Sequence, residues 1–317
     1  MAVIADWQRW VLEKVHPRQL KGAVRIQSLW GGYGELLRLQ LEPGPNLVLK
    51  WVQPPIQAVE STSDRRKRRS YQVEQAWYRG PGRNCPPQSR IATCLGLADG
   101  WLLLEDLEAQ GYRRSRGPGP QEIAGGLDWL AQFHAAYLGQ APAELWEQGS
   151  YWHLETRRDE WAAMQDGPFK QLAEALDQRL RAASFQTLLH GDAKPANFLW
   201  DESGRAAAVD FQYVGPGCGI RDVAYFLDGC LDESGCQLHA SHWLDHYFAQ
   251  LCRALGAREL GQLVEPLERE WRQLYPVAWS DFFRFWQGWG GCPSPGSYTL
   301  EQLQQAQLAL QAYQPGG

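Results

Sequence analysis

The sequence predicts an α+β protein with two lobes: a small lobe built on an antiparallel β-sheet with one helix, and a larger, mainly helical lobe. Roughly five strand-like segments fall within the first 104 residues, while the rest of the chain mostly follows helical periodicity and is rich in tryptophan. Apolar residues make up 44% and charged residues 21% of the 317 residues, which is the balance of a globular protein with a sizeable core.

The small lobe is expected to begin with a short amphipathic helix, because Trp7, Trp10 and Val11 recur at helical spacing. The segment 64–79 also suits a helix, with its apolar side chains on one face and Glu74 in its middle. Alternating or continuous apolar runs, with turn-forming residues between them, predict strands at 24–30, 36–41, 47–52, 91–97 and 101–104.

The character of the chain changes after residue 104. A stretch rich in Gly, Pro and Arg ends at residue 120, so we expect residues 1–104 to form the small lobe and residues 105–120 a hinge and linker. Residues 121–317 then form the helical lobe, beginning with a helix at 121–139.

The charge balance disfavours a general nucleic-acid binder, because the net charge is −5 and the pI is about 5.8. One basic run, Arg65 to Arg69, stands at the start of the predicted helix 64–79. We interpret it as a solvated helix start, and contact with an anionic substrate stays open.

Nothing in the sequence indicates a membrane or an export signal. No stretch approaches the ~20 apolar residues that a membrane span requires, and the N-terminal segment carries Asp6, Arg9 and Glu13. The seven cysteines are scattered without a zinc-type spacing, which favours reduced thiols. We therefore expect a cytoplasmic protein.

The strongest chemical signal is His190-Gly191-Asp192, with Asn197 five residues after the aspartate and Asp210 further on. Phosphoryl transfer requires a carboxylate that orients an attacking hydroxyl group and accepts its proton, together with oxygen ligands for Mg²⁺ beside the phosphates. A strand pair at 198–200 and 206–209 would form a hairpin that places Asp210 next to the loop. The spacing therefore suits one metal–phosphate site.

This pattern resembles the catalytic loop and metal-binding segment of the protein-kinase-like superfamily. Gly191 and Gln212 stand where protein kinases have Arg and Gly, and they make the chain similar to the aminoglycoside phosphotransferase and choline kinase group, closest to its ecdysteroid-kinase-like branch. The resemblance implies ATP and Mg²⁺ as cofactors, Asp192 as the catalytic base, and Asn197 and Asp210 as metal ligands.

Two lysines complete the implied chemistry. Lys194, two residues after Asp192, resembles the lysine with which serine/threonine protein kinases reach the transferred phosphate, and a cation there would stabilise charge on the γ-phosphoryl oxygens. Lys50 lies on a strand that resembles the V-A-I-K strand of kinases. Because a buried ammonium needs a counter-charge, Glu74 is its expected partner.

Further cofactor-binding residues follow from the same resemblance. Gly31, Gly32 and Gly34 stand between two predicted strands, where kinases have the loop that covers the phosphates. A tight hairpin turn would also explain these glycines. Glu105 and Leu107 follow an apolar strand and resemble the hinge whose backbone holds the adenine edge.

His190 and Asp222 are expected to support the site rather than to react, with Asp222 bracing the catalytic loop through hydrogen bonds. Only eleven residues separate Asp210 from Asp222, which leaves no room for the longer activation segment of protein kinases. The expected activity is phosphorylation of a small-molecule hydroxyl. The alternatives are a serine/threonine kinase-like enzyme and a catalytically inactive scaffold of the same fold.

The acceptor site is expected in the helical lobe. Residues 268–291 are rich in aromatic rings, which at helical spacing are more often core than ligand cage. If several face the cleft, they suit an apolar or aromatic alcohol, or a quaternary ammonium. The segment 151–154 is a further candidate. An aminoglycoside would require exposed carboxylates, for which Asp159, Glu160, Asp232 and Glu233 are candidates.

Overall fold

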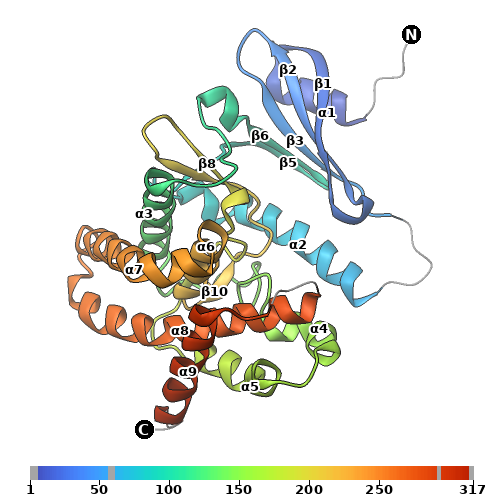
Figure 1. The fold of residues 1–317 in the computed structure, drawn as a ribbon. Helices are drawn as coiled ribbons and strands as arrows, with labels where there is room; N and C mark the ends of the chain where they lie inside the picture. The colour runs from blue at the N-terminus through green and yellow to red at the C-terminus, as the bar shows by residue number, and fades with distance from the viewer. Residues whose placement is uncertain (1–5, 56–60, 291–293, 314–317) are drawn as a thin grey trace.

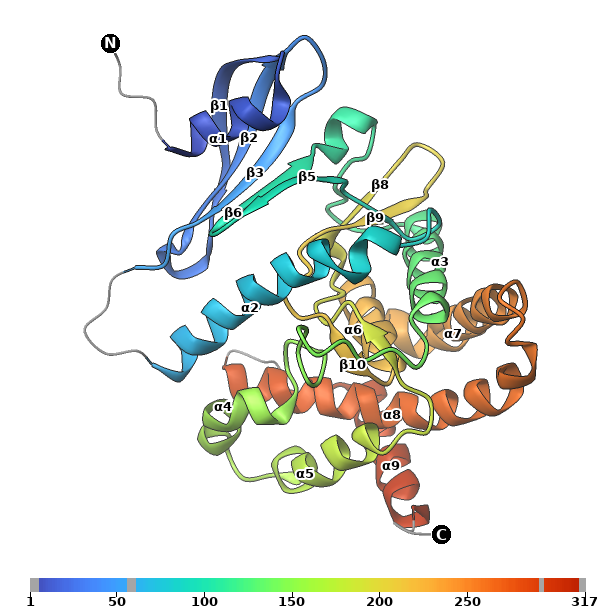
Figure 2. The same ribbon diagram turned by 180° about the vertical axis from the view of Figure 1, so that it is seen from behind.

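A five-stranded antiparallel sheet and a group of packed helices form the two lobes of the molecule (Figure 1). The structure is a computed structural model that describes residues 6–55, 61–290 and 294–313. Helix α2 (Thr62–Arg79) runs between the sheet and the helical lobe in both views (Figures 1 and 2). The two-lobed α+β class predicted from the sequence is confirmed.

The sheet of the small lobe has the strand order β1-β2-β3-β6-β5, and its neighbouring strands are antiparallel. The bounds are β1 (Gln19–Ser28), β2 (Gly34–Glu42), β3 (Leu47–Val52), β5 (Cys94–Ala98) and β6 (Trp101–Glu105). Strand β3 has the predicted bounds, whereas β1 begins earlier than predicted. Because β1 is an edge strand with mostly exposed side chains, apolar periodicity does not mark its start.

The two faces of this sheet have different surroundings. Successive residues of a strand point to opposite faces. On one face, Leu39 and Leu49 are fully buried beneath helix α1 (Asp6–Val15). On the other face, Val48 and Lys50 line a cavity between the lobes. The sheet therefore has one face packed by α1 and one face that contributes to a site.

The prediction of a single strand at 91–97 is wrong. Two strands occur there, β4 (Arg90–Ile91) and β5, with Ala92 and Thr93 between them. Strand β4 pairs in parallel with β9 (Ala206–Ala208), whereas β5 pairs with β6. One stretch of chain thus contributes to two sheets, and pairing with a segment more than a hundred residues away leaves no trace in the local apolar pattern.

Helices make up most of the larger lobe. Their bounds are α3 (Pro120–Ala136), α4 (Arg158–Ala163), α5 (Pro168–Arg181), α6 (Ile220–Cys230), α7 (Glu233–Gly256), α8 (Val264–Trp289) and α9 (Ser297–Ala312). Helix α3 packs on α7, and α8 packs on α5, α6 and α9, so α8 lies at the centre of the lobe. Trp129, Trp271 and Trp279 are among the large rings buried in the core, as expected for most of the tryptophans.

Within the described residues, no helix is both long and apolar enough to span a membrane. The six cysteines that the structure describes are free thiols, and the seventh, Cys292, lies outside the described residues.

Short strands hold both ends of the loop 190–197. Strand β7 (Thr187–Leu189) pairs with β10 (Gly215–Gly217), and β8 (Phe198–Trp200) forms the predicted hairpin with β9. The loop therefore starts directly after one strand and ends directly before another.

The 3₁₀ turns of the described chain are η1 (Trp30–Gly32), η2 (Pro81–Asn84), η3 (Leu107–Gln110), η4 (Leu154–Arg157), η5 (Pro195–Asn197) and η6 (Gly261–Leu263).

A buried charge network fixes α8 against α6 behind the site. The carboxylate of Asp281 on α8 accepts hydrogen bonds from Arg221 Nη2 at 2.6 Å and from Arg284 Nε and Nη2 at 3.0 and 2.7 Å. All three side chains are almost fully buried. Burial opposes ionisation, yet the two guanidinium groups lower the pKa of Asp281 below its usual value.

Removing this carboxylate would leave two buried guanidinium groups without their main partner. We expect Asp281→Ala to lower the free energy of unfolding by about 3–5 kcal/mol, measured by urea titration. Asp245→Ala removes an exposed aspartate that pairs with Arg272 and should cost no more than about 1 kcal/mol. Equal losses in the two variants would contradict the buried network as a source of stability.

Candidate active site

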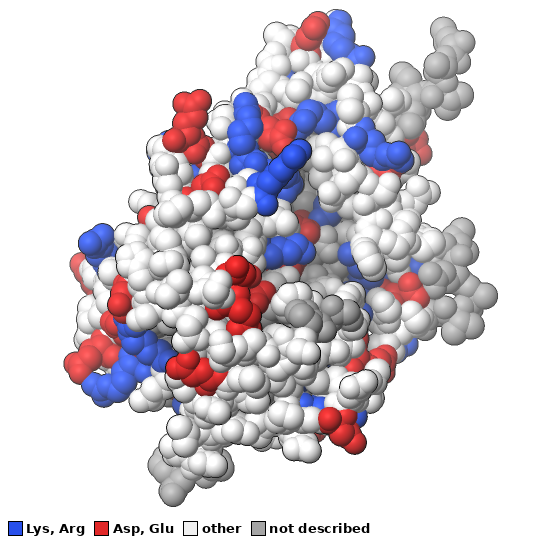
Figure 3. Space-filling model, in the orientation of Figure 1, with Lys and Arg blue, Asp and Glu red and all other residues white. Residues whose placement is uncertain are grey.

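Two adjoining cavities lie between the lobes, where the surface is hollowed and Lys and Arg side chains gather (Figure 3). The smaller, of about 380 Å³, lies beneath the sheet, and the larger, of about 730 Å³, extends toward α8. The residues that line both cavities are Trp30, Lys67, Lys194, Asp210 and Gln212. Asp192 lines the larger cavity and Asn197 the smaller, so the loop 190–197 lies at their junction.

The backbone of this loop is held by one buried carboxylate. Asp222, at the start of α6, accepts hydrogen bonds from the backbone N–H groups of His190 at 2.6 Å and Gly191 at 3.0 Å. His134 lies 3.3 Å from the same carboxylate and bonds to Tyr247 through its other ring nitrogen. Asp222 therefore makes the backbone hydrogen bonds to the loop that its place in the sequence predicts.

The backbone geometry of this loop explains why residue 191 is glycine. Its φ angle is +80°, a conformation that residues with a side chain rarely adopt. A Cβ atom at this position would also lie 2.1 Å from the carbonyl oxygen of Tyr213. Gly191 distinguishes this loop from that of protein kinases. It is required here because another segment of the chain approaches closely.

His190 is a buried structural residue in the position expected for one. Its Nε2 donates a hydrogen bond to the Val209 carbonyl at 3.0 Å, and its Nδ1 accepts one from the Asp192 N–H at 3.3 Å. Burial lowers its pKa, so the ring stays neutral. His190 thereby links the loop to the strand end that carries Asp210.

Asp192 is nearly buried, with a side chain 7% exposed. Its Oδ2 accepts hydrogen bonds from Lys194 Nζ at 2.9 Å and Asn197 Nδ2 at 2.8 Å. The other oxygen, Oδ1, is buried and has no partner of normal hydrogen-bond geometry among the described residues. Burial raises the pKa of Asp192 above its usual value, which makes its carboxylate a stronger base.

Lys50 joins the two lobes. Its ammonium lies 2.6 Å from Glu74 Oε2 on α2 and 2.8 Å from Asp210 Oδ1 in the helical lobe. Although burial disfavours the charged amine, the two carboxylates raise the pKa of Lys50 above its usual value. For Asp210, burial acts in the opposite sense but Lys50 dominates and lowers the pKa to about 2. Both groups are therefore charged at neutral pH.

Gln212 adds a contact that the sequence pattern did not predict. Its amide donates to Asp210 Oδ1 at 2.6 Å, while its carbonyl oxygen accepts from Ser70 on α2 at 3.1 Å. The residue that replaces the usual glycine thus connects Asp210 to α2. The sequence showed the departure from the protein-kinase pattern but offered no signal for this contact.

Asn197 and Asp210 suit a magnesium ion by the chemistry of their donors. Asn197 directs its amide nitrogen to Asp192, so its amide oxygen faces away from that carboxylate. Asp210 is ionised and lines the same smaller cavity. Mg²⁺ takes one or two carboxylate or amide oxygens and completes its shell with phosphate oxygens and water.

The remaining predicted cofactor residues divide into two groups. Glu105 and Leu107 line the smaller cavity, where Glu105 is fixed by Arg90 at 2.5 Å and by the Thr93 N–H at 3.0 Å. Of the three glycines, only Gly31 lines a cavity, and it is the larger one. Gly34 has a φ of +128° and no room for a Cβ beside the Trp51 carbonyl, so the tight turn accounts for it.

The aromatic rings of α8 fall into two sets. Rings in its middle, such as Trp271 and Trp279, are buried in the core. Rings near its end, among them Phe285, Trp286 and Trp289, line the larger cavity together with Tyr151. None of the four carboxylates considered for an aminoglycoside, Asp159, Glu160, Asp232 and Glu233, is among the described residues that line this cavity.

The interpretation of 65–69 as a solvated helix start is wrong for most of the run. Arg65 is exposed, but Arg66, Lys67 and Arg69 are half-buried. Arg66 and Lys67 line the larger cavity, while Arg69 donates hydrogen bonds to the backbone carbonyls of Glu144 and Leu145. Helix α2 packs against the helical lobe here, which only the tertiary structure reveals.

Gly191→Ala tests the close approach of the Tyr213 backbone to the loop 190–197. Gly139 has a similar φ of +76° but no neighbour within 4 Å, so Gly139→Ala reports the backbone strain alone. We expect Gly139→Ala to cost about 1–2 kcal/mol and Gly191→Ala to cost clearly more, because the Tyr213 backbone must also move. Thermal unfolding measures both. If the two losses are equal, the contact with Tyr213 does not restrict the loop.

Asp228, which also lines the larger cavity, should make stability depend on pH. Burial, with a smaller effect of Glu233, raises its pKa to about 7 in the folded state from 3.8. The folded chain then holds a proton that the unfolded chain releases, so stability falls as pH rises from about 4 to about 7, by up to about 4 kcal/mol. Asp228→Asn should flatten this slope in urea titrations. An unchanged slope in the variant would refute the raised pKa.

Residues 85–275, more than half of the chain, match the phosphotransferase enzyme family known as APH. A structure described as a fructosamine-3-kinase from Thermobifida fusca YX-ER1 shares 19% identity, with a TM-score of 0.57 and coverage of 98% of this chain and 100% of that chain. A structure described as an amicoumacin kinase in complex with AMP-PNP, Ca²⁺ and Ami shares 13%, with a TM-score of 0.56 and coverage of 97% and 94%. A gentamicin–APH(2")-IIa complex shares 13%, with a TM-score of 0.50 and coverage of 99% and 98%.

The search of curated proteins found no match to this chain. The three solved structures support the protein-kinase-like fold, and the matched segment contains the loop 190–197 together with Asp210 and Asp222. The predicted family is confirmed: this chain belongs to the phosphotransferase enzyme family.

Proposed function

We propose that this phosphotransferase moves the γ-phosphoryl group of ATP, in the presence of Mg²⁺, to a hydroxyl group of a small molecule. The observation that carries the proposal is the junction of the two cavities, where Asp192 faces the larger one and Asp210 borders both. Such a junction would bring a donor phosphate and an acceptor hydroxyl next to the same two carboxylates, as in-line phosphoryl transfer requires.

The nucleotide would occupy the smaller cavity. Val48, Leu104 and Leu199 provide apolar walls for a base, and Lys50 stands at the end where Asp210 lies. Its contact with Glu74 fixes the ammonium for the α- and β-phosphates. The structural neighbour that binds AMP-PNP supports the same use of the fold.

Asn197 and Asp210 would hold the magnesium ion, which supplies positive charge to the phosphate oxygens when it is bound. Asp210 also keeps its contact with Lys50 and Gln212, so its carboxylate is positioned before any nucleotide arrives. Positioning of this kind is what makes charge stabilisation effective in the transition state.

Asp192 would orient the acceptor hydroxyl and take its proton through Oδ1, which accepts no hydrogen bond of normal geometry from the described residues. A bond forms between the acceptor oxygen and the γ-phosphorus as the bond to the β,γ-bridging oxygen breaks, and ADP leaves with the electron pair. Lys194 lies 2.9 Å from Asp192 and borders both cavities, so it can stabilise the charge on the transferred group.

A small acceptor fits the structure better than a protein substrate. The path from Asp210 to α6 is short and includes strand β10, which is buried on β7. A peptide platform like the activation segment of protein kinases has no equivalent there. A catalytically inactive scaffold is disfavoured because all four residues are present, with Lys50 bonded to Asp210 and Asn197 bonded to Asp192.

Asp192→Asn should lower kcat by about three orders of magnitude or more while Mg·ATP binding is retained, because the change removes the proton acceptor and keeps the shape. Asp210→Asn should weaken Mg²⁺-dependent nucleotide binding as well. Asp99→Asn, at an exposed turn, serves as the matched control. Turnover is measured by mass gain in a screen of small alcohols, and nucleotide binding by calorimetry.

Full activity of Asp192→Asn would refute its role as the base. If the wild-type protein binds no Mg·ATP, the inactive scaffold becomes the better explanation.

A further inference from the structure

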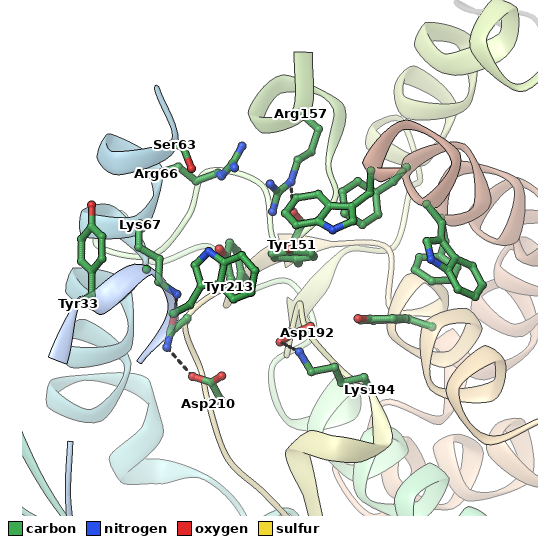
Figure 4. A pocket seen from close by; sticks show the side chains of 18 of the residues that line it. Tyr33, Ser63, Arg66, Lys67, Tyr151, Arg157, Asp192, Lys194, Asp210 and Tyr213 are labelled. Carbon is green, nitrogen blue, oxygen red and sulfur yellow. Dashed lines mark hydrogen bonds and ion pairs between the residues drawn. The ribbon is translucent and has the colours of Figure 1, made fainter. Parts of the chain in front are cut away.

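Two guanidinium groups meet at one side of the larger cavity. Arg66 comes from α2 and Arg157 from η4, and Figure 4 shows them side by side on the wall opposite Asp192 and Lys194. Arg157 is fully buried. Its Nε donates to the Tyr151 carbonyl at 2.8 Å and its Nη1 to Glu160 at 3.0 Å, whereas its Nη2 has no hydrogen-bond partner among the described residues.

This pair carries more positive charge than its surroundings neutralise. Among the described residues, Glu160 is the one carboxylate in contact with both groups, at 3.4 Å from Arg66 and 3.0 Å from Arg157. Burial, and next the charge of Arg157, lower the pKa of Arg66. Two half-buried or buried cations that share one anion can gain from a second anion in the cavity.

The walls beside Arg157 are aromatic. Its guanidinium lies 4.1 Å from the ring centroid of Tyr151, 5.2 Å from that of Phe285 and 5.1 Å from that of Trp289. The same three rings line the larger cavity. Cation–π contacts hold the guanidinium in place and leave apolar surface for the body of a ligand.

The carboxylates that line the cavity do not offer a site for a cationic acceptor. Asp192 is paired with Lys194, and Asp210 with Lys50. Asp64 is bound to Ser61 at its helix start and to the Tyr33 hydroxyl. Asp228 holds its proton up to about pH 7 because burial raises its pKa.

We propose that the acceptor is an anionic alcohol: an aromatic or apolar body with a carboxylate, sulfate or phosphate that Arg66 and Arg157 bind, and a hydroxyl group that reaches Asp192. This inference rests on the proposed phosphotransferase function and adds the substrate class. It sets this cavity apart from one that selects a cationic acceptor, because the charged contact to the substrate has the opposite sign.

The test compares three ligands that share one ring and one primary hydroxyl: 4-(hydroxymethyl)benzoate, its methyl ester and 4-(hydroxymethyl)benzylamine. Calorimetry with the full chain and saturating Mg·AMP-PNP keeps the anion away from the phosphate site. We expect the carboxylate to bind about tenfold more tightly than the ester, as one charge-assisted contact provides, and the amine to bind most weakly.

Arg66→Gln should abolish the preference for the carboxylate over the ester. Arg65→Gln removes the same charge from the neighbouring exposed position, where Arg65 contacts Thr62, and should keep the preference. Equal affinities for the three ligands, tighter binding of the amine, or no measurable binding of the carboxylate would overturn the inference. The titration with Mg·AMP-PNP alone reports separately on the proposed function, which fails if the nucleotide does not bind.

Discussion

The site depends on the two ion pairs made by the ammonium group of Lys50. It stands on the central strand of the sheet and touches Glu74 on α2 and Asp210 in the helical lobe, so a single charge connects the three parts of the molecule. A buried amine stays charged only while its carboxylates stay close. Because Asp210 borders both cavities, this contact lies where they meet.

The loop 190–197 is held by backbone contacts instead of by charge pairs. Asp222 accepts two backbone N–H groups, and Gly191 lets the chain pass beside the Tyr213 carbonyl. With the backbone fixed, Asp192 can remain nearly buried while its Oδ1 accepts no hydrogen bond of normal geometry from the described residues. Arg66 and Arg157, which would bind the acceptor, come from other segments of the chain. The groups that suit phosphoryl transfer are therefore structurally separate from those that would select the acceptor.

Much of the fold and of the candidate site could be predicted because its signals are local. The α+β class follows from strand-length apolar runs that give way to helical periodicity. The family is indicated by the resemblance of the segment with His190, Asp192, Asn197 and Asp210 to known kinase motifs. Strand 47–52 was predicted to the residue, since both of its ends carry turn-forming residues and its centre is apolar. The same family pattern predicts the contact of Lys50 with Glu74, and Lys50 Nζ lies 2.6 Å from Glu74 Oε2. The ecdysteroid-kinase-like branch stays a prediction.

The sequence by itself therefore determined the fold class and the family, and it supplied the residues proposed to carry phosphoryl transfer. Tertiary structure alone decided the split of 91–97 into β4 and β5, the burial of Arg66 and the position of Arg157, about ninety residues further along the chain. The physical reason is that burial and charge balance depend on segments that pack from a distance. A run of basic residues has the same local pattern whether it faces water or a cavity, and only the packing of α2 against η4 and α4 distinguishes the two.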